Sequence, residues 1–71
     1  MKDRIVNYIV RTNEFSRKTA EEIAEEIINL KYPYPIGLVQ DILLKYFGGE
    51  DDYAYETSYE MARKIVRLIR A

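Results

Sequence analysis

Much of the chemistry that proteins perform near neutral pH is closed to this chain, because it contains no histidine and no cysteine. Imidazole is the usual acid–base group at that pH, Cys and His supply most zinc ligands, and only Cys forms disulfides. Ser16 and Ser58 lie at expected helix starts, and the sequence offers no histidine to activate either hydroxyl. We therefore expect no catalytic residues and a protein that is not an enzyme.

The acidic residues form two groups that merit testing as oxygen ligands for a metal ion. The first group comprises Glu21, Glu22, Glu25 and Glu26, and the second comprises Glu50, Asp51, Asp52 and Glu56. Calcium loops need alternating oxygen ligands, a glycine turn and a distal bidentate glutamate, and residues 50–56 lack that order. The carboxylates of di-metal helical bundles point inward beside histidines, whereas the first group has the spacing of a solvent-exposed helix face. We expect no metal and no cofactor.

A basic stripe near the end of the chain is the feature best suited to nucleic acid. It comprises Arg63, Lys64, Arg67 and Arg70, which recur on one face of an expected helix and could contact phosphates. The chain as a whole has a net charge of −1, with 11 basic and 12 acidic residues, so it has no bulk attraction for polyanions. Pairing with the acids of the second helix, or simple solvation, is the plainer interpretation of the stripe.

Residues 19–24 resemble the first helix of a helix-turn-helix motif over six positions. That motif requires a tight turn followed by a helix that carries polar or basic side chains into the major groove. Here the connection contains two prolines, and the next helix is apolar with one acidic residue. These differences disfavour a helix-turn-helix motif. Nucleic-acid binding through the basic stripe is the alternative function.

Tyrosine is the most distinctive residue of the chain, with seven copies and no tryptophan. Two Tyr-x-Tyr pairs, Tyr32 with Tyr34 and Tyr53 with Tyr55, fall in the expected connections on either side of the third helix. Tyrosine combines a large apolar area with a polar tip, which suits protein interfaces. These four residues are our candidate partner contacts, provided that the two connections meet. The alternative is that each ring only seals an edge of a small core.

Apolar residues recur at helical spacing in four segments, which polar and proline-containing breaks separate. This pattern predicts an all-α fold in one compact domain over residues 1–71. The four expected helices span about 3–12, 17–31, 35–47 and 57–70. Thr19 and Thr57 each precede a glutamate by three residues, so Ser16 or Thr19 should begin the second helix and Thr57 the fourth. Pro35 suits the start of the third helix, and the glycines at 48–49 suit its end.

The third helix is apolar around nearly its whole circumference, with Gln40 beside a narrow polar strip. A helix of this kind is normally enclosed, so it should be central in the domain or should meet a second chain. Because a domain of this size buries little surface, a partner subunit would enlarge its core. We therefore expect a homodimer with Leu38, Leu43 and Phe47 as the candidates for self-association.

The sequence thus favours a small protein–protein interaction module of a regulatory, adaptor or inhibitor type. The N-terminus, residues 1–4, lacks the apolar run of a signal peptide, and no apolar stretch is long enough for a transmembrane helix. We therefore expect a cytoplasmic protein that does not bind membranes. The abundance of Glu, Ile, Tyr and Arg, with one Gln, is typical of thermophilic proteins.

Overall fold

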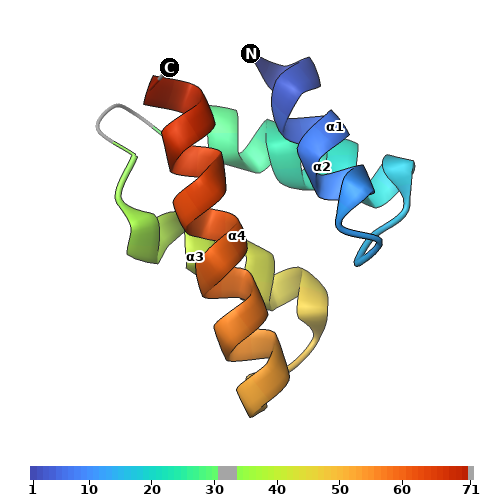
Figure 1. Cartoon of the computed structure of the whole chain (residues 1–71), viewed down its shortest axis with the longest axis vertical. Helices are drawn as coiled ribbons and strands as arrows, with labels where there is room; N and C mark the ends of the chain where they lie inside the picture. Colours follow the sequence, from blue (N-terminus) through green and yellow to red (C-terminus); the bar gives the residue numbers. More distant parts are fainter. Residues whose placement is uncertain (31–33, 71) are drawn as a thin grey trace.

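A computed structural model describes residues 1–30 and 34–70, and within those residues the chain forms four α-helices and no strand (Figure 1). The helices are α1 (Lys2–Arg11), α2 (Arg17–Ile28), α3 (Ile36–Phe47) and α4 (Asp52–Arg70). The prediction of an all-α, four-helix fold is confirmed. Among the described residues, no helix combines the length and the apolar character that crossing a membrane requires.

Local capping explains where α2 and α3 begin and where α3 ends. The Ser16 hydroxyl accepts a hydrogen bond from the backbone N–H of Thr19 at 3.3 Å, so Ser16 rather than Thr19 begins α2. Pro35 precedes α3 in an extended conformation, with φ at −65° and ψ at 133°. Gly48 ends α3 with φ at 76°, the left-handed region that glycine enters without strain.

Helix α4 begins five residues earlier than the sequence patterns predict, so residues 52–56, expected in an acidic loop, are helical. The side chain of Asp51 accepts a hydrogen bond from the backbone N–H of Ala54 at 2.7 Å, which caps the helix in place of Thr57. Asp52 in the first turn also suits the positive end of the helix dipole. As a result Tyr53 and Tyr55 lie on the first turns of α4.

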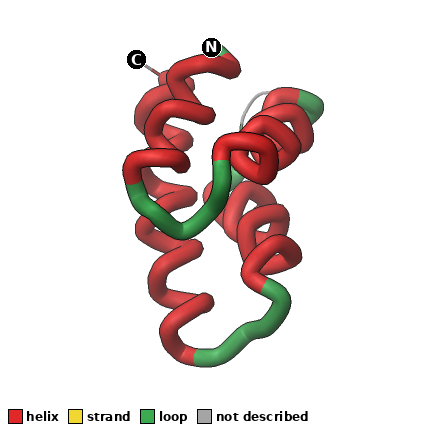
Figure 2. The backbone as a smooth tube through the Cα atoms, turned by 90° about the vertical axis from the view of Figure 1, so that its right-hand side faces the viewer, coloured by secondary structure: helices red, strands yellow, loops and turns green. Residues whose placement is uncertain are grey.

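The helices pack in a ring, and no helix occupies the centre. Helix α1 packs against α2 and α4, and α3 packs against the same two helices (Figure 2). Within the described chain, α1 and α3 do not approach each other closely, nor do α2 and α4. The expectation that the third helix is central is not confirmed, because α3 packs against α2 and α4 and keeps an outer face.

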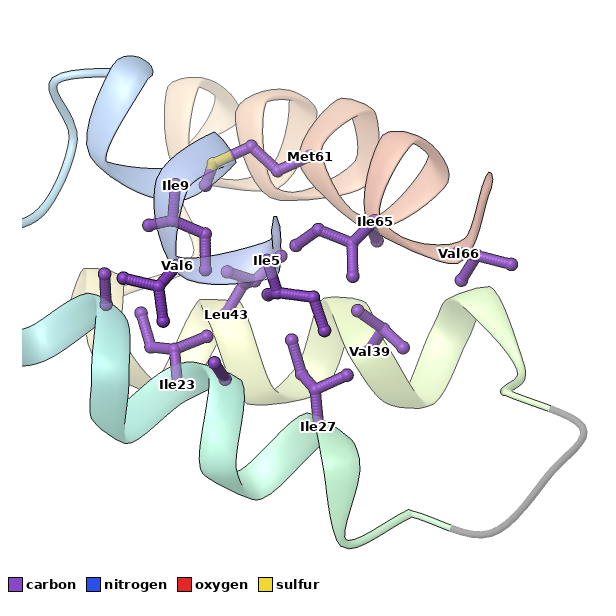
Figure 3. Close-up of a cluster of buried hydrophobic side chains, with 13 residues drawn as sticks. Ile5, Val6, Ile9, Ile23, Ile27, Val39, Leu43, Met61, Ile65 and Val66 are labelled. Atoms are coloured by element: carbon purple, nitrogen blue, oxygen red, sulfur yellow. The ribbon is translucent and has the colours of Figure 1, made fainter. Parts of the chain in front are cut away.

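Branched aliphatic side chains from every helix meet inside this ring and form the core (Figure 3). The largest fully buried ones are Ile5, Ile9, Ile23, Ile27, Leu43 and Ile65. Each aliphatic side chain buried in this way contributes roughly 1.5–3 kcal/mol through removal of apolar surface from water. All four helices therefore contribute to one core.

A buried polar network joins α3 to α4. The Gln40 side-chain amide donates to the backbone carbonyl of Tyr55 at 3.1 Å and to the hydroxyl of Ser58 at 3.3 Å. The Ser58 hydroxyl in turn donates to the same carbonyl at 3.0 Å. Gln40, which the sequence places beside the polar strip of this helix, is only 7% exposed, and its amide fixes where α4 lies on α3.

Candidate binding surface

An open hollow of about 380 Å³ lies between the C-terminal half of α4 and the adjacent face of α1. Its lining residues are Tyr8, Arg11, Lys64, Arg67 and Leu68. Tyr8 and Arg11 are three positions apart on α1, and Lys64 precedes Arg67 and Leu68 by three and four positions on α4, so each set shares one helix face. The hollow, which we call the α1–α4 groove, combines three cations with an aromatic ring and an aliphatic side chain.

Tyr8 is half-buried in the wall of this groove. Burial and the nearby negative charge of Glu60 raise the pKa of the Tyr8 phenol above its ordinary value. The ring therefore presents a neutral hydroxyl and an apolar face beside the exposed cations of Arg11 and Lys64. Such a site can receive an apolar group and an anionic group at the same time.

A second, smaller hollow of about 250 Å³ lies between the start of α3 and the end of α4. It is lined by Ile36, Arg63, Val66, Arg67 and Arg70. Arg67 lines both hollows. All members of the predicted basic stripe, Arg63, Lys64, Arg67 and Arg70, therefore lie along one exposed surface, and Arg11 of α1 extends it.

Among the described residues the acids of α2 do not pair with this stripe, so of the two plainer interpretations of the sequence, pairing and solvation, solvation remains. Glu25 pairs with Lys2 at 2.9 Å and Glu26 pairs with Lys45 at 2.5 Å. In the part of the chain that the structure describes, the stripe has one ion pair, between Arg63 and Glu60 of the same helix at 3.5 Å. The reason is the ring arrangement, since α2 and α4 are the helices that do not pack together.

The acidic face of α2 forms a separate hollow of about 490 Å³, in which lysines are interspersed among the carboxylates. Hydrogen bonds from Lys45 and Tyr46 lower the pKa of Glu26, and the bond to Glu26 raises the pKa of Tyr46 to about 12. Over residues 1–30 and 34–70, no group of three or more acidic side chains is arranged to hold a metal ion. The Glu26 contacts join α2 to α3, and the ion pair between Glu25 and Lys2 joins α2 to α1.

Of the predicted tyrosine contacts, Tyr34 and the pair of Tyr53 and Tyr55 lie on different segments of the chain. Tyr34 lies just before α3, whereas Tyr53 and Tyr55 lie at the start of α4. Helix α4 packs against α3, and the backbone carbonyl of Tyr55 accepts a hydrogen bond from Gln40 near the start of α3. The Tyr53 hydroxyl donates to a carboxylate oxygen of Glu14, which joins the start of α4 to the α1–α2 connection. Tyr55 is 54% exposed. Tyr32 lies outside the described residues.

The residues expected to mediate self-association point in different directions. Leu43 is fully buried in the core, so it is unavailable to a second chain, and its assignment to self-association is wrong. The Phe47 ring packs edge-on against Phe15, with 4.9 Å between the ring centroids. Leu38 is 49% exposed, and nine residues at about 100° each place it on the opposite side of α3 from Phe47.

Sequence patterns alone missed Tyr8, Arg11 and Leu68 as part of this surface. The signal for Tyr8 and Arg11 was their three-residue spacing, which places an aromatic and a cation on one face of α1. That spacing alone does not predict a binding surface, because the surface forms only where α1 packs beside the end of α4. No family model, curated protein or solved structure gives a significant match to the chain.

Proposed function

We propose that this chain is a small, non-enzymatic protein–protein interaction module that binds its partner in the α1–α4 groove. The observation that supports this proposal is the meeting of apolar and cationic side chains in one hollow, with Tyr8 and Leu68 beside Arg11, Lys64 and Arg67. Tyrosine and arginine are enriched among the residues that dominate protein interfaces. A regulatory, adaptor or inhibitor role follows from binding without chemistry.

Charge complementarity indicates the kind of partner. Lys64 and Arg67 have no carboxylate at ion-pair distance among the described residues, so each offers its full charge to a ligand. A surface cation of this kind adds little in water but gains strength where a partner excludes solvent. The proposed partner therefore presents acidic side chains together with at least one apolar side chain that fits between Tyr8 and Leu68.

A site-specific crosslink tests the proposal. A photoreactive amino acid at Leu68 lies in the groove, and the same amino acid at Leu38 is a matched control on an exposed position of α3. In cells that express the chain, we expect a discrete protein adduct from Leu68 that is lost when Lys64→Gln and Arg67→Gln are added. Identical adducts from both positions, or no adduct from Leu68, would contradict the proposal.

Nucleic-acid binding is the second candidate, and it is favoured by the basic stripe, whose one ion pair among the described residues is with Glu60 of the same helix. Phosphate contacts need no apolar hollow, and they make binding steeply dependent on salt. Labelled duplex and single-stranded DNA should therefore be titrated against the chain at low salt, with the R63E/R67E variant as control. Binding that is lost in R63E/R67E and at higher salt would favour this candidate over a protein partner, and no binding at tens of micromolar protein would eliminate it.

A further inference from the structure

The solvent-facing side of α4 divides into an acidic half and a basic half. The acidic residues are Asp52, Glu56 and Glu60, the basic residues are Arg63, Arg67 and Arg70, and all of them are exposed. They recur every three or four positions, so they form one continuous stripe along the 19-residue helix. Acidic first turns and basic last turns suit the helix dipole, but that effect reaches only the terminal turns and does not explain Glu60 and Arg63 at the middle.

We infer that this stripe is the interface of a symmetric homodimer in which two α4 helices pack side by side and antiparallel. In a two-fold dimer the same surface meets itself, so it must be self-complementary. Antiparallel pairing about a point between Glu60 and Arg63 brings the acidic half of each helix against the basic half of the other. Glu60 then faces Arg63 of the second copy, and Glu56 faces Arg67, because both pairs are equidistant from that point.

Aromatic residues supply apolar area along one edge of the same stripe. Tyr55 and Tyr59 are 54% and 42% exposed, and they flank the acidic half on the side of α4 that faces α3. A two-fold axis perpendicular to both helices keeps this edge on the same side in the two copies. The two Tyr59 rings therefore lie near the axis, each within reach of an arginine, as Arg63 already lies 5.9 Å from the Tyr59 ring centroid within one chain.

Little has to be given up in the monomer to form these contacts. The existing Arg63–Glu60 pair is long, at 3.5 Å, and both side chains are about half exposed or more, at 45% and 61%. Such a pair contributes close to nothing in water, so its exchange for the equivalent pair between copies costs little. This surface differs from the α3 face that the sequence suggested, and it is separate from the α1–α4 groove except at Arg67.

Charge-swap variants test the dimer through sedimentation velocity. The R63E/R67E chain has an acidic stripe apart from Arg70, and the E56R/E60R chain has a basic one apart from Asp52. We expect the wild-type chain to dimerise at about 0.1 M salt and to dissociate near 1 M, where screening is short-ranged. We expect each double variant alone to remain monomeric, their equimolar mixture to form a heterodimer, and the quadruple variant to dimerise like the wild type.

The mixture is the decisive sample, because it restores every proposed contact with two chains that fail separately. Circular dichroism should first show that both double variants retain wild-type helix content, since all substituted residues are exposed. A wild-type chain that stays monomeric up to millimolar concentration overturns the inference, as does a folded mixture that does not associate. The single variant E56R leaves intact both the groove residues and Glu60, whose charge acts on Tyr8, so its effect separates this interface from the proposed partner site.

Discussion

Replacement of Gln40 by glutamate removes hydrogen-bond donors from the polar network that joins α3 to α4. The Gln40 amide nitrogen donates to the Tyr55 carbonyl and to the Ser58 hydroxyl, and the residue is 7% exposed. An ionised carboxylate at this site donates no hydrogen and faces a carbonyl oxygen. Two lost hydrogen bonds at about 1 kcal/mol each, plus a partly unpaired buried charge, predict a loss of roughly 3–5 kcal/mol in the free energy of unfolding near pH 7.

The Q40L variant separates the lost hydrogen bonds from the buried charge. In Q40L the Ser58 hydroxyl still donates to the Tyr55 carbonyl at 3.0 Å, so no buried donor is orphaned. We therefore expect Q40L to cost only about 1–2 kcal/mol. The exposed neighbouring substitution D41N is a matched control that should change stability by less than about 0.5 kcal/mol.

The destabilisation in Q40E has a definite dependence on pH. Because the buried site disfavours the charged form, the new carboxyl has a higher pKa in the folded state than in the unfolded state, where it is about 4.3. Stability is therefore highest below that value and falls as the pH rises through the folded-state pKa. Urea unfolding followed by circular dichroism at several pH values measures this effect. Equal stability of Q40E and Q40L near pH 7 would refute the reasoning.

The remaining predictions concern packing, backbone conformation and ionisation. Ile27→Ala should lower the free energy of unfolding by about 3 kcal/mol in urea denaturation, because Ile27 is fully buried. Gly48→Ala should destabilise the protein by about 1 kcal/mol because φ is 76° there. Gly37→Ala should raise the free energy of unfolding by about 0.5 kcal/mol, because Gly37 is helical and a Cβ there meets no atom within 4 Å. A lower free energy of unfolding in both glycine variants would contradict this account. In an absorbance titration the Tyr46 phenol should ionise near pH 12. Because its pKa is higher in the folded state than in the unfolded state, the stability that its hydrogen bond with Glu26 contributes should be lost as the pH rises from about 10 to 12. The E26Q variant should abolish this pH dependence of stability.

Local signals in the sequence were sufficient for most helix boundaries. Gly48 ends α3 because only glycine enters the left-handed region freely, and Ser16 begins α2 because its hydroxyl can accept a backbone hydrogen bond. Both effects act within one turn, so neighbouring residues suffice to predict them. The start of α4 was missed because Asp51 and Thr57 are both competent caps, and the patterns favoured the second.

The arrangement of the helices was beyond these local signals. The burial of Leu43 and Gln40 depends on which helix lies across α3, and their own positions in the sequence do not specify it. The basic stripe was recognised from its spacing, but its lack of neutralisation by Glu25 and Glu26 follows from α2 and α4 lying on opposite sides of the ring. Charge pairing between distant helices requires the tertiary structure.

The proposed partner site is tested most directly by calorimetric affinity measurements with the protein that crosslinks at Leu68. The K64Q/R67Q variant removes two groove cations, and R17Q/K18Q removes two exposed cations from the start of α2 as a matched control. We predict that K64Q/R67Q weakens binding about 30-fold or more, equivalent to about 2 kcal/mol, while R17Q/K18Q leaves it unchanged. Equal affinities of the two variants for that protein would contradict the assignment of the α1–α4 groove as the binding site.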